Sequence, residues 1–160
     1  MKFTCQHFQE NYRECTKCSD VAEENKRKYI LQNPSRKKVC KVRIDGCVIT
    51  SQSQRKCDYL MIVCEDEASN QAESVDLYFV ELKGRDLMSA VEQLTETIKY
   101  FQANNYRFFG KVFARVVVSH VSRPTASIDT DPRVKSLRNL LKKLGGNFDY
   151  RAVRFEKDCI

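Results

Sequence analysis

Two acids and a lysine interrupt apolar runs in the middle of the chain. Asp58 is the only charged residue in the run 57–64, and Glu81 and Lys83 close the run 76–83. Burial of an unpaired carboxylate is costly, so such groups need mutual pairing, solvent at a strand end or a bound cation. Carboxylate oxygens suit Mg²⁺ or Mn²⁺ better than zinc. The alternative is an exposed Glu81–Lys83 pair at a fraying strand end.

Both runs have the character of central β-strands. Successive side chains of a strand point to opposite faces, so Glu81 and Lys83 share a face with Leu77 and Phe79. The opposite face carries Tyr78, Val80 and Leu82. In the first run, Asp58, Leu60, Ile62 and Cys64 share one face, and Tyr59, Met61 and Val63 share the other. Strands that are apolar on both faces are typical of a sheet covered on both sides.

The remaining pattern predicts the elements that position these strands. The expected elements are a helix from Ser19 or Asp20 to about Gln32, a strand over 39–44 with a hairpin at Asp45-Gly46 into Cys47–Ile49, strands over 57–64 and 76–83 around a loop at 65–74, a helix capped by Asp86, a strand over 111–120, a helix from Asp131-Pro132 to Gly145, and a strand over 148–155. This order predicts an α/β domain with a central mixed β-sheet flanked by helices. A length of 160 residues fits a single domain over 1–160, with 1–18 as an N-terminal appendage.

The charged residues and their order resemble the PD-(D/E)XK nuclease superfamily, which is restriction-endonuclease-like. Asp58 lies on one strand, Glu81-Leu82-Lys83 on the next, and an amphipathic helix follows directly. That helix carries Gln93, which is similar to the accessory glutamine of some members. The chain departs from the family pattern in having Cys57 before Asp58 and Thr97 where a tyrosine often follows the glutamine. Some members add an acid from the first helix, for which Glu23 and Glu24 are the candidates.

The resemblance implies an endonuclease that hydrolyses phosphodiester bonds with Mg²⁺ or Mn²⁺. Asp58, Glu81 and the backbone carbonyl of Leu82 would hold the metal ion, and Lys83 would orient the attacking water and stabilise transition-state charge. Gln93 would be an accessory catalytic residue beside Asp58, Glu81 and Lys83. The resemblance favours DNA over RNA as substrate and a role in phage defence, restriction or repair. Cleavage of both strands of a duplex would suit a homodimer.

Charge is distributed unevenly along the chain. The net charge of +7 divides into +4 over 1–39, −5 over 40–98 and +8 over 99–160. A basic body around an acidic centre suits a polyanion partner, although a plain solvated surface has the same pattern. The candidates for phosphate contacts are Arg36, Lys37, Lys38, Lys142 and Lys143. Aromatic residues that could stack on bases, or belong to the core, are Tyr12, Tyr100, Tyr106, Phe108 and Phe109.

Eight cysteines and the absence of an apolar run near 20 residues predict a cytoplasmic protein with reduced thiols and no membrane partner. Cys47, Cys57 and Cys64 are interpreted as small core residues. Two alternatives to a nuclease remain. The first is a non-catalytic module of the same fold that binds nucleic acid or protein. The second is an interaction protein stabilised by zinc on Cys15 and Cys18, with Cys5 and His7 as further ligands.

Overall fold

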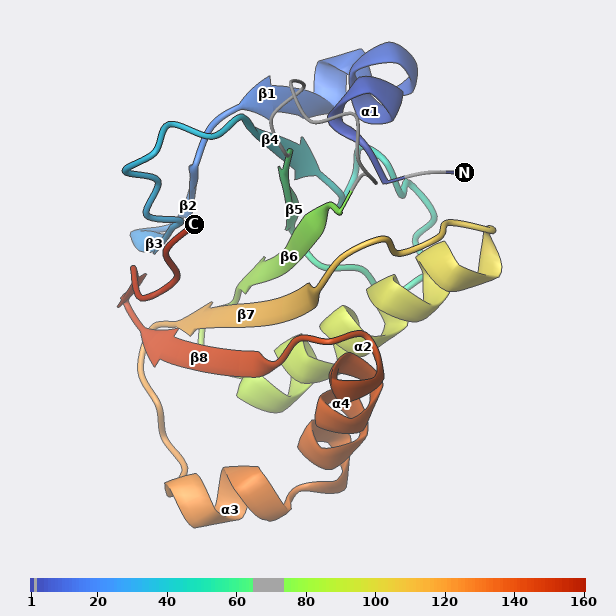
Figure 1. The fold of residues 1–160 in the computed structure, drawn as a ribbon. Helices are drawn as coiled ribbons and strands as arrows, with labels where there is room; N and C mark the ends of the chain where they lie inside the picture. Colours follow the sequence, from blue (N-terminus) through green and yellow to red (C-terminus); the bar gives the residue numbers. More distant parts are fainter. Residues whose placement is uncertain (2, 65–73) are drawn as a thin grey trace.

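A central six-stranded mixed sheet organises the computed structural model, which describes residues 1, 3–64 and 74–160 (Figure 1). Its strands, in spatial order, are β1 (Thr16–Cys18), β4 (Val39–Arg43), β5 (Tyr59–Val63), β6 (Asp76–Leu82), β7 (Val112–Val118) and β8 (Phe148–Ala152). Neighbours are antiparallel from β1 to β6 and parallel from β6 to β8. The predicted α/β fold with a mixed sheet flanked by helices is confirmed. Except for Ser74, the loop expected over 65–74 lies outside the described residues.

Helices cover one face of this sheet and a small second sheet covers the other (Figure 1). The helices are α1 (Cys5–Asn11), a 3-10 helix (Arg13–Cys15), α2 (Leu87–Ala103), α3 (Thr125–Thr130) and α4 (Pro132–Lys143). The second sheet contains β2 (Val21–Glu24), β3 (Arg27–Ile30) and β9 (Arg154–Phe155). Leu77 and Phe79 of β6 pack on the helical side, whereas Tyr78 and Val80 pack on the other. The predicted division of strand faces is therefore confirmed.

The helix expected over 19–32 is wrong, because this segment forms the β2–β3 hairpin. Its turn residues Asn25 and Lys26 have φ of 48° and 65°, which gives the right-handed twist that short hairpin turns favour. Glu23 lies opposite Lys28, and Ala22 and Tyr29 are buried between the two sheets. Burial on a sheet face outweighed the capping-box spacing that suggested a helix start.

Three further differences from the expected elements concern a turn, a break in a strand and two short helices. Asp45-Gly46 does form a turn, but the chain then closes on itself, with the Ile49 amide donating to the Ile44 carbonyl at 3.0 Å, so 47–49 is not a strand. The strand expected over 148–155 breaks at Val153, whose φ of 66° turns β9 away to pair with β3. The short helices α1 and α3 were not predicted. By contrast, Asp86 and Asp131 cap α2 and α4 as expected.

The N-terminal segment is part of the domain and not an appendage. Phe3 and Phe8 are fully buried in the helix-side core, and β1 extends the central sheet. Packing of this segment brings cysteines distant in sequence together, and disulfides join Cys5 to Cys64 and Cys15 to Cys47. The expectation that all eight cysteines are reduced is therefore wrong for these four, and the core interpretation holds for Cys57 alone of its three candidates. Among the described residues, no helix has the length and apolar character required to span a membrane.

Candidate metal and catalytic site

Asp58 and Glu81 meet across the β5–β6 pair. The register places Tyr59 opposite Val80, so the next position outward places Asp58 opposite Glu81 on the helical face. Directly opposed residues of antiparallel strands have their Cβ atoms within about 5.5 Å of each other. One carboxylate oxygen of Asp58 accepts a hydrogen bond from the Leu82 amide at 2.8 Å. The two acids are thus neighbours by backbone pairing, as the sequence predicted.

Glu81 is an acid in an environment that disfavours its charge. Its side chain is 2% exposed, and its Oε2 atom has no hydrogen-bond partner among the described residues. Burial, followed by hydrogen bonding to and charge repulsion from Asp58, raises the pKa of Glu81 to about 11. At neutral pH without a cation, Glu81 therefore carries a proton. Since buried polar atoms are nearly always satisfied, the unpaired oxygen indicates a place for a ligand.

Lys83 follows Glu81 on the same side of the strand. The Lys83 amide donates to the Val117 carbonyl at 3.0 Å, which keeps this residue in register with β7 beyond the end of β6. The side chain is half-buried, and its positive charge partly offsets the rise in the pKa of Glu81. The Leu82 amide points toward Asp58, and the N–H and C=O of one strand residue point to the same neighbouring strand. The Leu82 carbonyl is therefore directed to the Asp58 side.

Gln93 comes from α2, which packs over the start of β5. One turn after Gln93, the Thr97 hydroxyl accepts from the Cys57 amide at 2.8 Å and donates to the Gln93 carbonyl at 2.6 Å. These bonds fix α2 against the residue that precedes Asp58. The Gln93 Oε1 atom is buried and has no partner among the described residues. Within that part of the chain, two of the three buried side-chain atoms without partners belong to Glu81 and Gln93.

Asp45 is a third acid near the site that the sequence reasoning missed. Its negative charge contributes to the raised pKa of Glu81, after the effects of burial, Asp58 and Lys83. The Ile44 amide donates to the Asp58 carbonyl at 2.8 Å, which anchors the turn beside β5. The Asp45 side chain is half exposed, 3.9 Å from the Lys56 amine. The Asp-Gly pair was interpreted only as a turn signal, and nothing in its spacing linked it to Asp58.

The acids proposed from a first helix do not join the site. Glu24 accepts a hydrogen bond from the Tyr59 hydroxyl at 3.1 Å, on the face of the sheet opposite to Asp58. Glu23 forms an exposed pair with Lys28 at 3.6 Å. Because the segment is a hairpin on the second sheet, neither carboxylate reaches the helical face.

The predicted phosphate-binding residues lie away from the two acids. Lys38 lies next to Cys64, whose amide donates to the Lys38 carbonyl at 2.9 Å. Cys64 is six residues from Asp58 along the strand, which corresponds to about 20 Å. Arg36 and Lys37 precede Lys38. Lys142 and Lys143 end α4 beside the start of β7, where the Val112 amide donates to the Leu144 carbonyl. All five therefore lie toward the ends of the strands that are remote from Glu81.

A different basic cleft lies next to the carboxyl ends of β6 and β7. It has a volume of about 410 Å³, and its lining includes Arg85, His120, Arg123 and Arg133. The Ser119 amide donates to the Gly84 carbonyl at 2.7 Å, which joins the segments leading from Lys83 and from β7. A larger hollow of about 590 Å³ includes Met1 and Tyr106 in its lining and lies at the far end of α2. The lining of the smaller cleft begins two residues after Lys83 along the chain and does not include Asp58, Glu81 or Lys83 themselves.

The aromatic residues and the zinc ligands predicted from the sequence have structural roles. Phe3 packs against Tyr106 and Phe108, at ring separations of 4.7 and 5.0 Å. Tyr12 and Tyr100 are half-buried against the same core, and only Phe109 among the stacking candidates is exposed. The predicted zinc ligand set does not assemble, because Cys15 is bonded to Cys47 and the His7 ring pairs with the Tyr106 hydroxyl at 2.8 Å.

No family model, curated protein or solved structure matches this chain. Asp58, Glu81 and Lys83, with the chemistry that their geometry permits, are therefore the basis for inferring a function.

The protonated state of Glu81 predicts how stability depends on pH. The unfolded chain releases this proton near the ordinary pKa of 4.5, whereas the folded protein retains it to about pH 11. Between these values the folded state binds more protons, so stability falls as pH rises. We expect Glu81→Gln to be more stable than wild type at pH 8, by about 1–3 kcal/mol, with a smaller difference at pH 5. Urea unfolding of both proteins at pH 5 and 8, without metal, measures this.

A bound cation should have the opposite pH dependence. Binding of Mg²⁺ by Glu81 requires loss of the proton, so the Mg²⁺-induced rise in melting temperature should increase from pH 6 to pH 9. In Glu81→Gln, Mg²⁺ should raise the melting temperature little at any of these pH values.

In the urea experiment, a wild-type free energy of unfolding with the same pH dependence as that of Glu81→Gln would contradict the assignment of a buried, protonated Glu81.

Proposed function

We propose that this protein is a divalent-metal-dependent endonuclease that hydrolyses phosphodiester bonds of DNA, on a restriction-endonuclease-like fold. The observation that carries the proposal is the placement of Glu81, buried with an unpaired oxygen, opposite Asp58 and two residues before Lys83. Two opposed carboxylates with an amine beside them suit a hard cation and a phosphate.

The order of elements around the site supports this proposal. Strands β4, β5 and β6 form an antiparallel meander, α2 follows β6 directly, and β7 returns parallel to β6. Asp58 thus directly precedes the middle strand β5, Glu81 lies near the end of β6 with Lys83 just after it, and Gln93 lies on the helix that follows. This order is compatible with the resemblance, and sheet register rather than sequence proximity brings together residues 23 positions apart.

Different residues of the chain would perform different parts of the hydrolysis. Asp58, Glu81 and the Leu82 carbonyl would hold Mg²⁺ or Mn²⁺, which when bound lowers the pKa of a water and offsets charge on the phosphate. Lys83 orients the attacking water and stabilises the negative charge that develops on the phosphate oxygens. The water oxygen forms a bond to phosphorus and releases one proton to solvent, while the bond to the leaving oxygen breaks and that oxygen takes up a proton from solvent. Gln93 would direct its free oxygen toward the water or the cation shell.

Asp58 and Glu81 would repel a polyanion. The basic cleft that follows Lys83 along the chain supplies positive charge that offsets this repulsion. Arg85 is exposed and has no ion-pair partner among the described residues, so it is available for a phosphate. Arg123 and Arg133 both pair with Asp131, which fixes their positions in the lining of the cleft. Phosphate contacts of this kind would make DNA binding depend strongly on salt. Two strands of a duplex would require two such sites, which a homodimer provides.

A cleavage assay tests this function. Purified protein is incubated with supercoiled plasmid DNA and with RNA, in Mg²⁺, in Mn²⁺ and in EDTA. We expect nicked and linear plasmid with either metal, no products in EDTA, and no cleavage by Glu81→Ala. Plasmid that is bound but never cut under any metal condition would contradict the nuclease and favour the non-catalytic alternative. Cleavage that survives Glu81→Ala would contradict the assigned site.

A further inference from the structure

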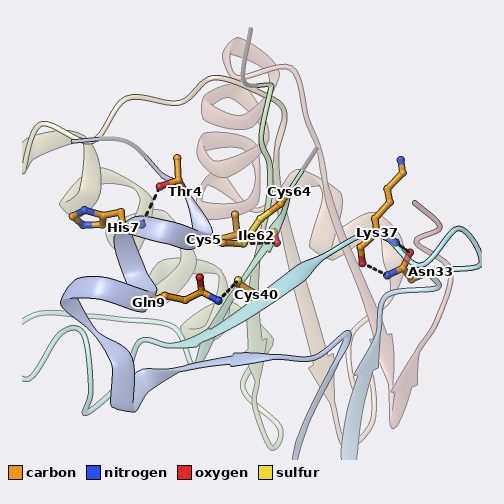
Figure 2. The surroundings of a disulfide bond; sticks show 9 residues. All are labelled: Thr4, Cys5, His7, Gln9, Asn33, Lys37, Cys40, Ile62 and Cys64. Atoms are coloured by element: carbon orange, nitrogen blue, oxygen red, sulfur yellow. Dashed lines mark hydrogen bonds between the residues drawn. A yellow bond between two sulfur atoms is a disulfide. The ribbon is translucent and has the colours of Figure 1, made fainter. Parts of the chain in front are cut away.

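Three cysteine sulfurs meet at the end of the sheet opposite to Glu81. The Sγ atoms of Cys5, Cys40 and Cys64 all lie within 4.8 Å of one another. Cys5 begins α1, Cys40 lies on β4 and Cys64 follows β5, so three separate elements converge there (Figure 2). Cys5 and Cys64 are joined by a disulfide, and Cys40 is a free thiol beside it. A disulfide alone accounts for two of these sulfurs and gives no reason for the third.

A fourth cysteine lies on the same face of the sheet. Cys18 of β1 is paired directly with Cys40 of β4 in the antiparallel register. Directly opposed residues of antiparallel strands have their Cβ atoms within about 5.5 Å of each other, so the Cys18 and Cys40 side chains are neighbours. Cys18 is exposed and Cys40 is fully buried, so the four sulfurs extend from the core to solvent. The Gln9 amide donates to the Cys40 sulfur at 3.7 Å and adds a hydrogen bond of the type that supports metal-bound thiolates (Figure 2).

We propose that in the reduced protein Cys5, Cys40 and Cys64 bind one Zn²⁺, with Cys18 as the fourth ligand. Zinc bound tetrahedrally by thiolates at about 2.3 Å separates its sulfurs by about 3.8 Å. Three sulfurs already within 4.8 Å need only small side-chain movements to reach that separation once the disulfide is opened. Four thiolates exclude the hard cations that suit the carboxylates of the nuclease site.

The metal-bound and disulfide states exclude each other, since a thiolate ligand cannot also be half of a disulfide. A dithiol reductant opens the Cys5–Cys64 bond by supplying two electrons and two protons, and becomes a disulfide itself. Binding of Zn²⁺ then releases the four thiol protons to solvent. The site would act as a cross-link in both states, zinc when reduced and a disulfide when oxidised.

The zinc site is separate from the nuclease site. Six residues of β5 lie between Asp58 and Cys64, which corresponds to about 20 Å along a strand. A zinc ion there would fasten α1 and β1 to β4 and the end of β5, and thereby hold the N-terminal segment that contributes Phe3 and Phe8 to the core. Loss of nuclease activity and loss of zinc are therefore independent results.

Metal analysis of the full chain tests the proposal. The protein is purified without oxygen in the presence of a dithiol and assayed for zinc and iron by mass spectrometry. We expect about one zinc per chain. Replacement of zinc by Co²⁺ should give the intense sulfur-to-cobalt absorption of a thiolate site. Wild type oxidised with a thiol oxidant should contain the Cys5–Cys64 disulfide and no zinc, and this comparison needs no substitution that affects folding.

Matched cysteine variants separate the ligands from the other thiols. Cys40→Ser should weaken zinc binding at least about tenfold, whereas Cys57→Ser, at an equally buried free cysteine, should not. Cys18→Ser should change the cobalt spectrum, whereas Cys159→Ser, which is also exposed, should not. Reduced wild type without zinc, or with stoichiometric iron in its place, would overturn the proposal, as would equal zinc affinity in wild type and Cys40→Ser.

Discussion

Lys83→Met should lower the rate of DNA cleavage by about 10²–10³-fold without weakening DNA binding to the same degree. The substitution retains the length of the side chain that follows Glu81 and removes only its charge. Because that charge stabilises the phosphate most strongly in the transition state, its loss should affect the rate of the bound complex. Single-turnover cleavage with protein in excess over DNA measures this rate, and a gel-shift assay in Ca²⁺ measures binding.

Lys99→Met provides the control for this change. Lys99 is an exposed lysine on α2 that pairs with Glu96 at 3.8 Å, so its removal makes the same change in net charge. We expect its cleavage rate to stay within about threefold of wild type, since surface pairs of this kind contribute little. Equal losses in the two variants would show that net charge, and not the position of Lys83, determines the rate. An unchanged rate in Lys83→Met would remove this lysine from the mechanism.

The central strands and the faces on which Asp58 and Glu81 lie were predictable because strand residues alternate between faces. Apolar residues on both faces of 57–64 and 76–83 indicated two buried strands, and charges inside them were conspicuous for that reason. The register that sets Asp58 opposite Glu81 is a finding of the structure, and the sequence suggested that the two acids meet only through the family resemblance. Asp86 and Asp131-Pro132 likewise gave the starts of α2 and α4, since capping depends on local contacts.

The parts that were not predicted depend on contacts between distant segments. The β2–β3 hairpin contains a sequence compatible with a helix, and its burial against the central sheet decides the outcome. The proximity of Asp45 to Glu81 and the meeting of Cys5, Cys40 and Cys64 arise from tertiary packing of loops and strand ends. The basic cleft is formed by segments after β6 and after β7, whereas charge counts along the chain pointed to Lys38 and Lys143.

Asp158→Ala should destabilise the protein by about 3–5 kcal/mol, because it leaves a buried guanidinium without its partner. The Asp158 carboxylate accepts from Arg115 at 2.7 and 3.1 Å and from the Tyr29 hydroxyl at 2.7 Å. The Arg115 side chain is only 5% exposed and lies against the rings of Phe113 and Phe155. Removal of Asp158 therefore breaks three hydrogen bonds that join β3, β7 and the C-terminal segment. Urea unfolding followed by circular dichroism measures the loss.

Asp149→Ala is the matched control, because Asp149 forms an ion pair with Arg151 at a similar distance, 2.8 Å, but with both side chains about one-third exposed to solvent. We expect this change to cost less than about 1 kcal/mol. Similar losses in the two variants would mean that burial does not determine the contribution of Asp158. The larger loss expected for Asp158 has a consequence for the candidate site. Arg115 lies opposite Val80, the residue that precedes Glu81, so the same ion pair supports the sheet beneath the two opposed acids.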